Sequence, residues 1–207
     1  MTQTNIPLPD EAPIMVLPGA ILFPNSILPL RIFEPRYRAM LEWVLENDRM
    51  FCVALMKPEV DEAETEEQFF HTAGIGLVSA SVTQPDGTSH LMLQGLARVR
   101  FTGFPQRVPF RIGKIEALPE VAHNPEKTAP LANLIRKKCG AVRVNGAPLP
   151  DAFAKTIAQI SDPASLLSTV ANALVSDPVT RQRLLELPDT GARLLELMRI
   201  LDGYLAD

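Results

Sequence analysis

The chain has 207 residues, of which 46% are hydrophobic and 21% are charged. These values are typical of a soluble globular protein with one large domain or two small ones. The formal net charge of −4 argues against a dedicated nucleic-acid binder, which carries a basic excess. The two cysteines, Cys52 and Cys139, exclude a disulfide framework and a zinc spacing. We find no signal peptide and no apolar run of about 18 residues, so we expect a cytoplasmic protein that does not contact a membrane.

The first part of the chain predicts strands followed by a helix. Residues 14–17 and 27–33 are apolar, and the prolines between them exclude a continuous helix. Residues 34–48 have helical spacing, with Glu34 at the start and Pro35 as the first helical residue. The strand "RMFCVALMK" follows and is expected to bury Cys52. Six acidic residues between positions 59 and 67 then predict an exposed, mobile loop, and their spacing is not that of a calcium loop.

Residues 71–104 are the clearest β segment. The sequence "QPDGT" predicts a hairpin turn, and Gly95 predicts a bulge or tight bend on the return strand. Beyond it, Arg98 and Arg100 alternate with apolar residues, which predicts one apolar face and one cationic face. A further strand, "PFRIGKIEAL", should pair nearby. His71 and His90 flank the hairpin and are expected to lie near one another, but two histidines are too few for a metal site.

After Pro119 the composition is helical. The stretch "VAHNPEKTAP", which contains His123, predicts a linker. Two helix starts are marked by an aspartate before a proline, Asp162–Pro163 and Asp177–Pro178. Cys139 follows two lysines, which would lower the pKa of its thiol if the side chain were exposed. The last helix carries an apolar stripe, interpreted as core with a partner-binding helix as the alternative; its members are Leu194, Leu197, Met198, Leu201, Tyr204 and Leu205.

The predicted fold class is α+β. A twisted β domain with an inserted helix should occupy residues 1–120, and a helical subdomain should occupy residues 121–207. The sequence contains no P-loop, no Gly-x-Gly-x-x-Gly turn and no Gly-x-Ser-x-Gly elbow. Glu34 beside Arg31 and Arg36 is interpreted as a structural ion pair rather than a general acid. We therefore predict that the chain is not an enzyme and that it uses neither a cofactor nor a metal.

Three stretches resemble the N-terminal substrate-binding domain of Lon proteases: "VLPGAILFPNSILPLRIFEPRYRAML", "GIGLVSASVTQPDGTSHLMLQGLARVRF" and "LLELPDTGARLLELMRIL". The "IFEPRY" variant is most similar to free-standing bacterial Lon substrate-binding domain-containing proteins. The resemblance implies a PUA-like pseudo-barrel, a helical subdomain, and recognition of unfolded or tagged polypeptides. The sequence ends at Asp207 without an ATPase or Ser-Lys protease module, so we expect ATP-independent binding without proteolysis.

The corner formed by residues 31–37 is the centre of the predicted binding surface. Leu28, Leu30 and Ile32 alternate on one strand face, and Arg31 and Phe33 project from the other. Arginine and aromatic side chains are enriched at binding hot spots, although a strand-to-helix corner needs similar residues for structural reasons. The candidate surface for a polypeptide or protein partner consists of Arg31, Phe33, Glu34, Arg36, Tyr37, Arg98 and Arg100.

Three hypotheses remain open. A polypeptide-binding module predicts an exposed apolar groove, either between the two domains or along an unpaired strand edge. An adaptor or regulator with one folded partner predicts a flat, specific patch. An unrecognised enzyme or an RNA binder that uses the sheet predicts that Arg98, Arg100, Arg107 and Arg111 converge on one face. The lack of stacking aromatic residues near these arginines argues against RNA. We expect a monomer or a weak dimer.

Overall fold

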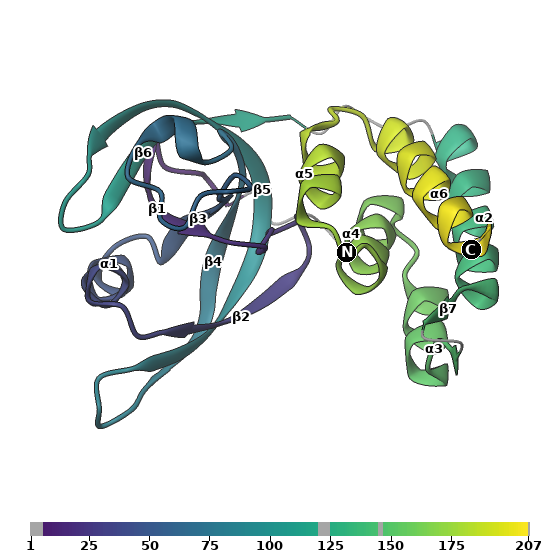
Figure 1. Cartoon of the computed structure of the whole chain (residues 1–207), viewed down its shortest axis with the longest axis horizontal. Coiled ribbons are helices and arrows are strands. Elements are labelled where there is room, and N and C mark those ends of the chain that lie inside the picture. Colours follow the sequence, from purple (N-terminus) through teal and green to yellow (C-terminus); the bar gives the residue numbers. More distant parts are fainter. Residues whose placement is uncertain (1–5, 120–124, 145–146, 207) are drawn as a thin grey trace. The chain divides into compact units, whose positions relative to one another are not determined.

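The computed structural model describes residues 6–119, 125–144 and 147–206, which form two compact units (Figure 1). The first contains residues 6–22 and 27–118 and holds the six-stranded sheet. The second contains Phe23–Ser26 and the residues from 119 onward, and it is helical. The predicted α+β class is confirmed.

The sheet of the first unit closes on itself through most of its strands. Its order is β2-β5-β4-β3-β1-β6, and β5 also pairs with β6. The pair β1 and β3 is parallel, and the other pairs are antiparallel. Closure leaves β2 as the edge strand of this sheet. The strands are β1 (Glu11–Leu17), β2 (Ile27–Ile32), β3 (Met50–Leu55), β4 (Thr72–Thr83), β5 (Ser89–Gln106) and β6 (Arg111–Leu118).

The long hairpin of β4 and β5 is formed as the sequence predicts. Its turn places Gly87 at φ 79°, and the N–H of Gln84 donates to the carbonyl of Thr88 at 2.7 Å. The register shifts where Gly76 pairs with Gly95, which confirms the predicted bulge near Gly95. The bulge divides β5, because β2 pairs with its first part up to Gln94 and β6 pairs with the part from Arg98.

The inserted helix α1 (Pro35–Glu46) covers one of two hydrophobic clusters. Glu34 is its N-cap residue and Pro35 stands in its first turn, both as predicted. Tyr37, Met40 and Val44 face this cluster with the inward side chains of β2 and the first part of β5. The second cluster lies between β1, β3, β4 and the second part of β5, and it contains Cys52, which is buried as predicted.

The second unit consists of helices and a short hairpin. Its elements are α2 (Pro125–Ala141), β7 (Arg143–Val144), β8 (Ala147–Pro148), α3 (Asp151–Gln159), α4 (Pro163–Leu174), α5 (Pro178–Glu186) and α6 (Thr190–Ala206). Asp162 and Asp177 cap α4 and α5 as predicted, each accepting a backbone N–H at 2.8 Å. The hydroxyl of Ser168 in α4 donates to the carbonyl of Pro24 at 2.9 Å, which anchors the turn formed by Phe23–Ser26 in this unit.

The predicted linker is helical where the structure describes it. The helix α2 begins at Pro125 and continues through Pro130. Proline is favourable in the first helical turn and costs one backbone hydrogen bond further on, a loss that burial of Ala132, Ile135 and Cys139 offsets. Residues 120–124, including His123, lie outside the described part of the chain. None of the described helices has the length and apolarity needed to cross a membrane.

The neighbouring lysines would lower the pKa of the Cys139 thiol only if its side chain were exposed, and that condition is not met. Cys139 is buried, and burial raises the pKa of its thiol to about 11.

The expectation that His71 and His90 lie near one another is wrong. His90 pairs with Val82 near the hairpin turn, whereas the carbonyl of His71 accepts the N–H of Phe101 at the other end of the hairpin.

The apolar stripe of α6 is core at Leu194, Leu197 and Leu201, and its last members, Tyr204 and Leu205, are exposed.

The fold predicts a large effect of a methyl group at Gly74. A Cβ added there would lie 1.9 Å from the carbonyl oxygen of Leu22, which is backbone and cannot rotate away. We expect Gly74→Ala to lower the free energy of unfolding by about 3 kcal/mol, measured by urea denaturation with the fluorescence of Trp43, the single tryptophan. Gly103→Ala is the control, because its Cβ would make ordinary contact with Lys114 at 3.5 Å. Equal stability of the two variants would contradict this packing.

Candidate functional site

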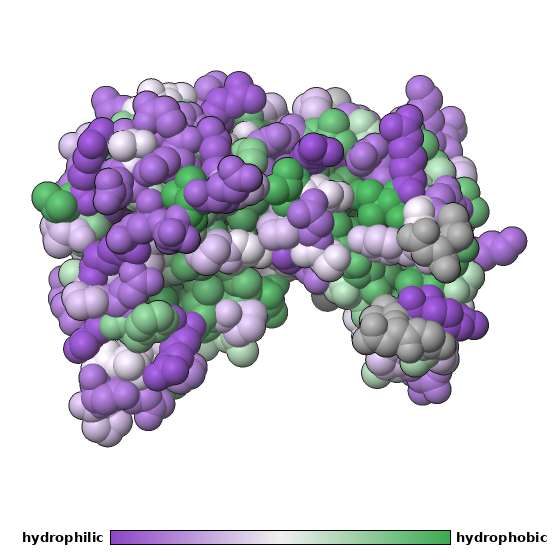
Figure 2. Space-filling model, viewed as in Figure 1, coloured by the Kyte–Doolittle hydropathy of each residue, from purple (hydrophilic) through white to green (hydrophobic). Residues whose placement is uncertain are grey.

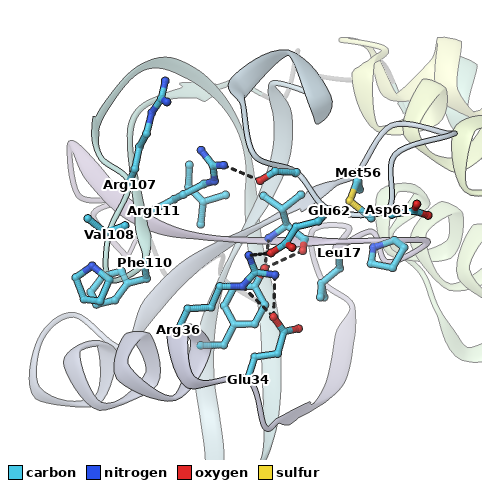
Figure 3. A pocket seen from close by; sticks show the side chains of 16 residues that line it. Leu17, Glu34, Arg36, Met56, Asp61, Glu62, Arg107, Val108, Phe110 and Arg111 are labelled. Carbon is cyan, nitrogen blue, oxygen red and sulfur yellow. Dashed lines mark hydrogen bonds and ion pairs between the residues drawn. The ribbon is translucent and has the colours of Figure 1, made fainter.

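The predicted corner is a cluster of ion pairs at the start of α1. Arg36 contacts the carboxylate of Glu34 at 2.7 Å and that of Glu62 at 2.8 Å (Figure 3). Its guanidinium also lies over the ring of Tyr37, 4.8 Å from the centroid. Arg36 therefore joins the helix start to the acidic segment, which confirms the interpretation of Glu34 as a member of a structural ion pair.

Tyr37 binds the backbone of β1. Its hydroxyl accepts the N–H of Val16 at 3.2 Å and donates to the carbonyl of Val16 at 2.9 Å. β1 pairs with β6 only as far as Ile14, so the tyrosine hydroxyl satisfies backbone groups beyond the end of that pairing. Burial raises the pKa of the hydroxyl above its ordinary value, which keeps it protonated and able to donate. The role of Tyr37 in this geometry is to attach the helix to the sheet.

The acidic segment, defined here as residues 58–68 and called the strap, contacts Arg36, Arg107 and Arg111. The expectation of an exposed, mobile loop is wrong at Glu66, whose side chain is 15% exposed and lies 2.6 Å from Arg107 and 3.6 Å from Arg111. Arg111 also donates to the carbonyls of Ala63 and Glu64 at 2.6 and 2.7 Å. Like charges in a sequence repel, but arginines from distant segments neutralise two of them here, Glu62 and Glu66.

A cavity of about 340 Å³ lies between the strap, the start of α1 and the loop after β5 (Figure 3). Its apolar lining includes Met56, Val108 and Phe110, and its charged lining consists of arginines and carboxylates in equal number. Most of these groups are engaged in the ion pairs described above. The charges that line the cavity are therefore largely balanced by one another. In the described part of the chain, no three histidine, cysteine or acidic side chains are grouped so that they could hold a metal ion.

The predicted cationic face does not exist as a surface. Arg98 is 1% exposed, and Arg107 and Arg111 are paired with Glu66. Arg100 alone of the four is both exposed and without an ion pair to a described carboxylate, on a stretch of β5 that pairs with Thr72 and Glu116. Strand alternation correctly separates Arg98 and Arg100 from the apolar residues between them. Alternation does not determine whether a face is covered, which is why the prediction is wrong for Arg98.

The predicted site residues are therefore not brought together. Glu34, Arg36 and Tyr37 line the cavity, whereas Arg31 and Phe33 lie on the opposite side of β2 from the side chains that α1 covers. Arg31 is exposed, Phe33 is 58% exposed, and the guanidinium lies 6.0 Å from the centre of the phenyl ring. These two residues belong to a different surface.

That surface is the outer face of β2, β5 and β4, and we call it the apolar face. Its apolar members on the strands are Ile27, Pro29, Ala80, Val82 and Met92, and its polar members are Arg31, His90 and Gln94. Phe33, which directly follows β2, also belongs to it through its contact with Arg31. Residues that pair directly across antiparallel strands project to the same side, so Pro29, Met92 and Ala80 form one row, and Arg31, His90 and Val82 the next. Figure 2 shows apolar side chains gathered over the lower part of the first unit, where Figure 1 labels β2 and β4.

Several members of the apolar face are exposed to an unusual degree for large apolar side chains. Ile27 is 64% exposed, Val82 is 61% exposed and Met92 is 45% exposed. Neighbouring exposed apolar residues mark interaction surfaces more often than single ones do. The alternation of Leu91 and Leu93 with Met92 could have placed Met92 outward from sequence alone, but its proximity to Ile27 and Val82 depends on strand pairing.

Comparison with known proteins identifies the family. Residues 11–203 match the family described as the ATP-dependent protease La (LON) substrate-binding domain. The chain belongs to this family. The Lon protease of Desulfosudis oleivorans is 29% identical over 206 residues, which cover 98% of this chain and 25% of that protein. Lon protease 2 of Syntrophobacter fumaroxidans is 28% identical over 189 residues, which cover 90% of this chain and 24% of that protein. The chain thus spans about a quarter of the length of these relatives.

Solved structures agree in fold. The N-terminal domain of Mycobacterium avium complex Lon protease matches with a TM-score of 0.72 and 16% identity, covering 95% of this chain and 98% of that one. The Lon N-terminal domain protein from Xanthomonas campestris matches with a TM-score of 0.66 and 19% identity, covering 91% and 97%. The resemblance to Lon N-terminal domains is confirmed, and the PUA-like assignment of the barrel stays a prediction.

Tyr37→Phe tests the attachment of α1 to β1. The variant keeps the ring but leaves the N–H and carbonyl of Val16 without their buried partner. We expect the free energy of unfolding to fall by about 2 kcal/mol, measured with urea and Trp43 fluorescence. The second tyrosine of the chain supplies the control, because Tyr204 is exposed and Tyr204→Phe should not change the stability of the first unit. An unchanged transition for Tyr37→Phe would contradict this role.

Glu66→Gln tests the strap. The substitution keeps the shape of the side chain but removes the charge that faces Arg107 and Arg111. We expect a loss of about 2 kcal/mol in the free energy of unfolding, because a charged hydrogen-bonding partner is lost at a mostly buried position. Glu64→Gln removes an exposed charge from the same strap and should change stability by less than about 0.5 kcal/mol. Urea denaturation at pH 7 distinguishes the two, and equal effects would mean that the strap responds only to its total charge.

Proposed function

We propose that this chain is a non-enzymatic module that binds unfolded or tagged polypeptide segments on its apolar face. The observation that carries the proposal is the cluster of exposed apolar side chains on the outer side of β2, β5 and β4. An unfolded chain exposes the apolar side chains that a folded protein buries, so a surface of this kind has more to gain from the unfolded form. Membership of a substrate-binding family supports the proposal.

The composition of the apolar face also fits a binding role. Methionine, aromatic residues and arginine are enriched at interfaces, and Met92, Phe33 and Arg31 supply one of each. The unbranched side chain of methionine adapts to partners of different shape, which suits a site that accepts many sequences.

We propose that contact occurs through side chains of the face rather than by addition of a strand to the edge. The edge strand β2 contains Pro29, which has no backbone N–H. A proline in an edge strand interrupts the row of donors that an added strand needs. Side-chain contact depends less on the sequence and direction of the bound segment than backbone pairing does.

The RNA-binding alternative has less support. It requires converging arginines, and Arg98 is buried while Arg107 and Arg111 are paired with Glu66. Among the described residues, no three metal-ligating side chains are grouped to hold a metal ion, and residues 11–203 match a substrate-binding family.

Fluorescence anisotropy tests the proposal. The probe is a fluorescein-labelled protein whose disulfides have been reduced and blocked with iodoacetamide, so that it cannot refold. We expect saturable binding to the blocked form and none to the native form. The double variant Val82→Thr/Met92→Thr places a β-branched side chain, which strands favour, at both positions and should weaken binding on the order of tenfold.

Val108→Thr is the matched control. Val108 is 80% exposed but lies in the loop after β5, beside the cavity rather than on the apolar face. Its substitution should leave the dissociation constant unchanged. Absence of binding to the blocked protein would overturn the proposal and favour a single folded partner, and equal weakening by both variants would show that the apolar face is not the site.

A further inference from the structure

The apolar face contains one charged side chain among its described members, and it is a cation. Arg31 lies in the row with His90 and Val82, next to the row of Pro29 and Met92. No carboxylate projects from the same side of these three strands, because the remaining members of the face are apolar or neutral. A segment that covers the apolar face therefore meets a positive charge at the edge of its apolar contacts.

Arg31 differs from three other arginines of the first unit in forming no ion pair with a described carboxylate. Arg36, Arg107 and Arg111 each lie within 4.0 Å of a glutamate carboxylate. Arg31 forms no such ion pair with any described residue, and its guanidinium lies over the ring of Phe33, 6.0 Å from the ring centre. Its guanidinium thus keeps its hydrogen-bond donors for a ligand, and the stacked ring restricts its position.

The hairpin turn beside Arg31 leaves the local charge positive. The guanidinium of Arg38 packs against Gly87 in the turn, in the space that a side chain at position 87 would occupy. Asp86 is the turn's carboxylate, and it accepts the N–H and hydroxyl of Thr88 at 2.9 and 2.8 Å. These bonds, with smaller contributions from Arg31 and Arg38, lower the pKa of Asp86. The carboxylate of Asp86 is therefore already hydrogen-bonded within the turn, and two arginines, Arg31 and Arg38, lie near it.

We infer that the apolar face prefers polypeptide segments whose apolar residues are flanked by aspartate or glutamate, and discriminates against segments flanked by lysine or arginine. The inference rests on the proposed function, since it concerns which segments the same face accepts. The juxtaposition that carries it is the unpaired guanidinium of Arg31 beside Ile27, Pro29, Val82 and Met92. A carboxylate accepts two parallel N–H bonds from a guanidinium, whereas an ammonium group is repelled by it.

The net charge of −4 for the whole chain does not oppose this preference. At physiological ionic strength the screening length is about 8 Å, so the nearest charges dominate the interaction with a bound segment. In the acidic strap, Glu62 is paired with Arg36 and Glu66 is paired with Arg107, so arginines neutralise these two carboxylates. The charge of Arg31 therefore dominates the electrostatic interaction of the apolar face with a bound segment.

Three labelled peptides test the inference by anisotropy. They share one six-residue apolar centre, and each end carries two aspartates, two serines or two lysines. We expect the aspartate peptide to bind on the order of tenfold more tightly than the lysine peptide at 0.1 M NaCl, with the serine peptide between them. The difference should largely disappear at about 1 M NaCl, where the screening length is about 3 Å.

Arg31→Gln identifies the responsible group. The variant keeps a polar side chain of similar reach, so the ratio of affinities for aspartate and lysine peptides should fall to about twofold, and binding of the serine peptide should persist. Lys114→Gln removes an exposed cation from β6 and should leave the ratio unchanged. Retention of the full ratio in Arg31→Gln would overturn the assignment to Arg31.

The outcomes separate the inference from the proposed function. Binding of the serine peptide with equal affinity for the two charged peptides would overturn the charge preference and leave the apolar site supported. Tighter binding of the lysine peptide would likewise overturn the preference. Failure of all three peptides to bind would overturn the proposed function itself, and the preference with it.

Discussion

The register of the β4–β5 hairpin is the constraint on which the first unit depends. The turn at Gly87 sets the pairing of the two strands, and the bulge at Gly95 changes it part-way along. The part of β5 before the bulge pairs with β2, and the part after the bulge pairs with β6, which closes the sheet. A slip by one residue would exchange Leu91 and Leu93 for Met92 and Gln94 in the core under α1. The same register that builds the core therefore brings Met92 to the outer face.

Close backbone packing supports this register. Gly74 and Gly76 in β4 allow the chain at Leu22 to approach the strand without a side chain between them. Any larger residue would separate the two segments and shift the start of β2. Glycine here serves close approach rather than an unusual backbone conformation, because neither residue has a positive φ.

Electrostatic pairing distinguishes three arginines around the acidic strap from Arg31. Arg36, Arg107 and Arg111 are used to hold the acidic strap against the helix corner and the loop after β5. Arg31 is left without a carboxylate, at the margin of the exposed apolar side chains. The cavity beside the strap is thus internally neutral, whereas the apolar face carries a cation. This contrast is why we place the binding function on the apolar face and not in the cavity.

Most of the strands, helices and turns of this protein could be predicted from its sequence. Spacing of prolines and apolar residues predicted the strands, the helix starting at Pro35, the Asp-Gly hairpin, the bulge and the capped helices, because these depend on interactions between residues close in the chain. Alternation in β2 correctly placed Ile32 inside and Arg31 outside. The family could also be predicted, since its motifs are local stretches that survive at low overall identity.

Which charged side chains form ion pairs, and which apolar side chains lie side by side, depends on contacts between segments far apart in the sequence. The pairing of Glu66 with Arg107 joins residues 41 positions apart, and the row of Pro29, Met92 and Ala80 joins three strands. Arg98 and Arg31 occupy similar outward positions in strand patterns, yet one is buried and the other exposed. Burial and pairing depend on which distant segment covers a residue, and no periodicity within a single strand contains that information.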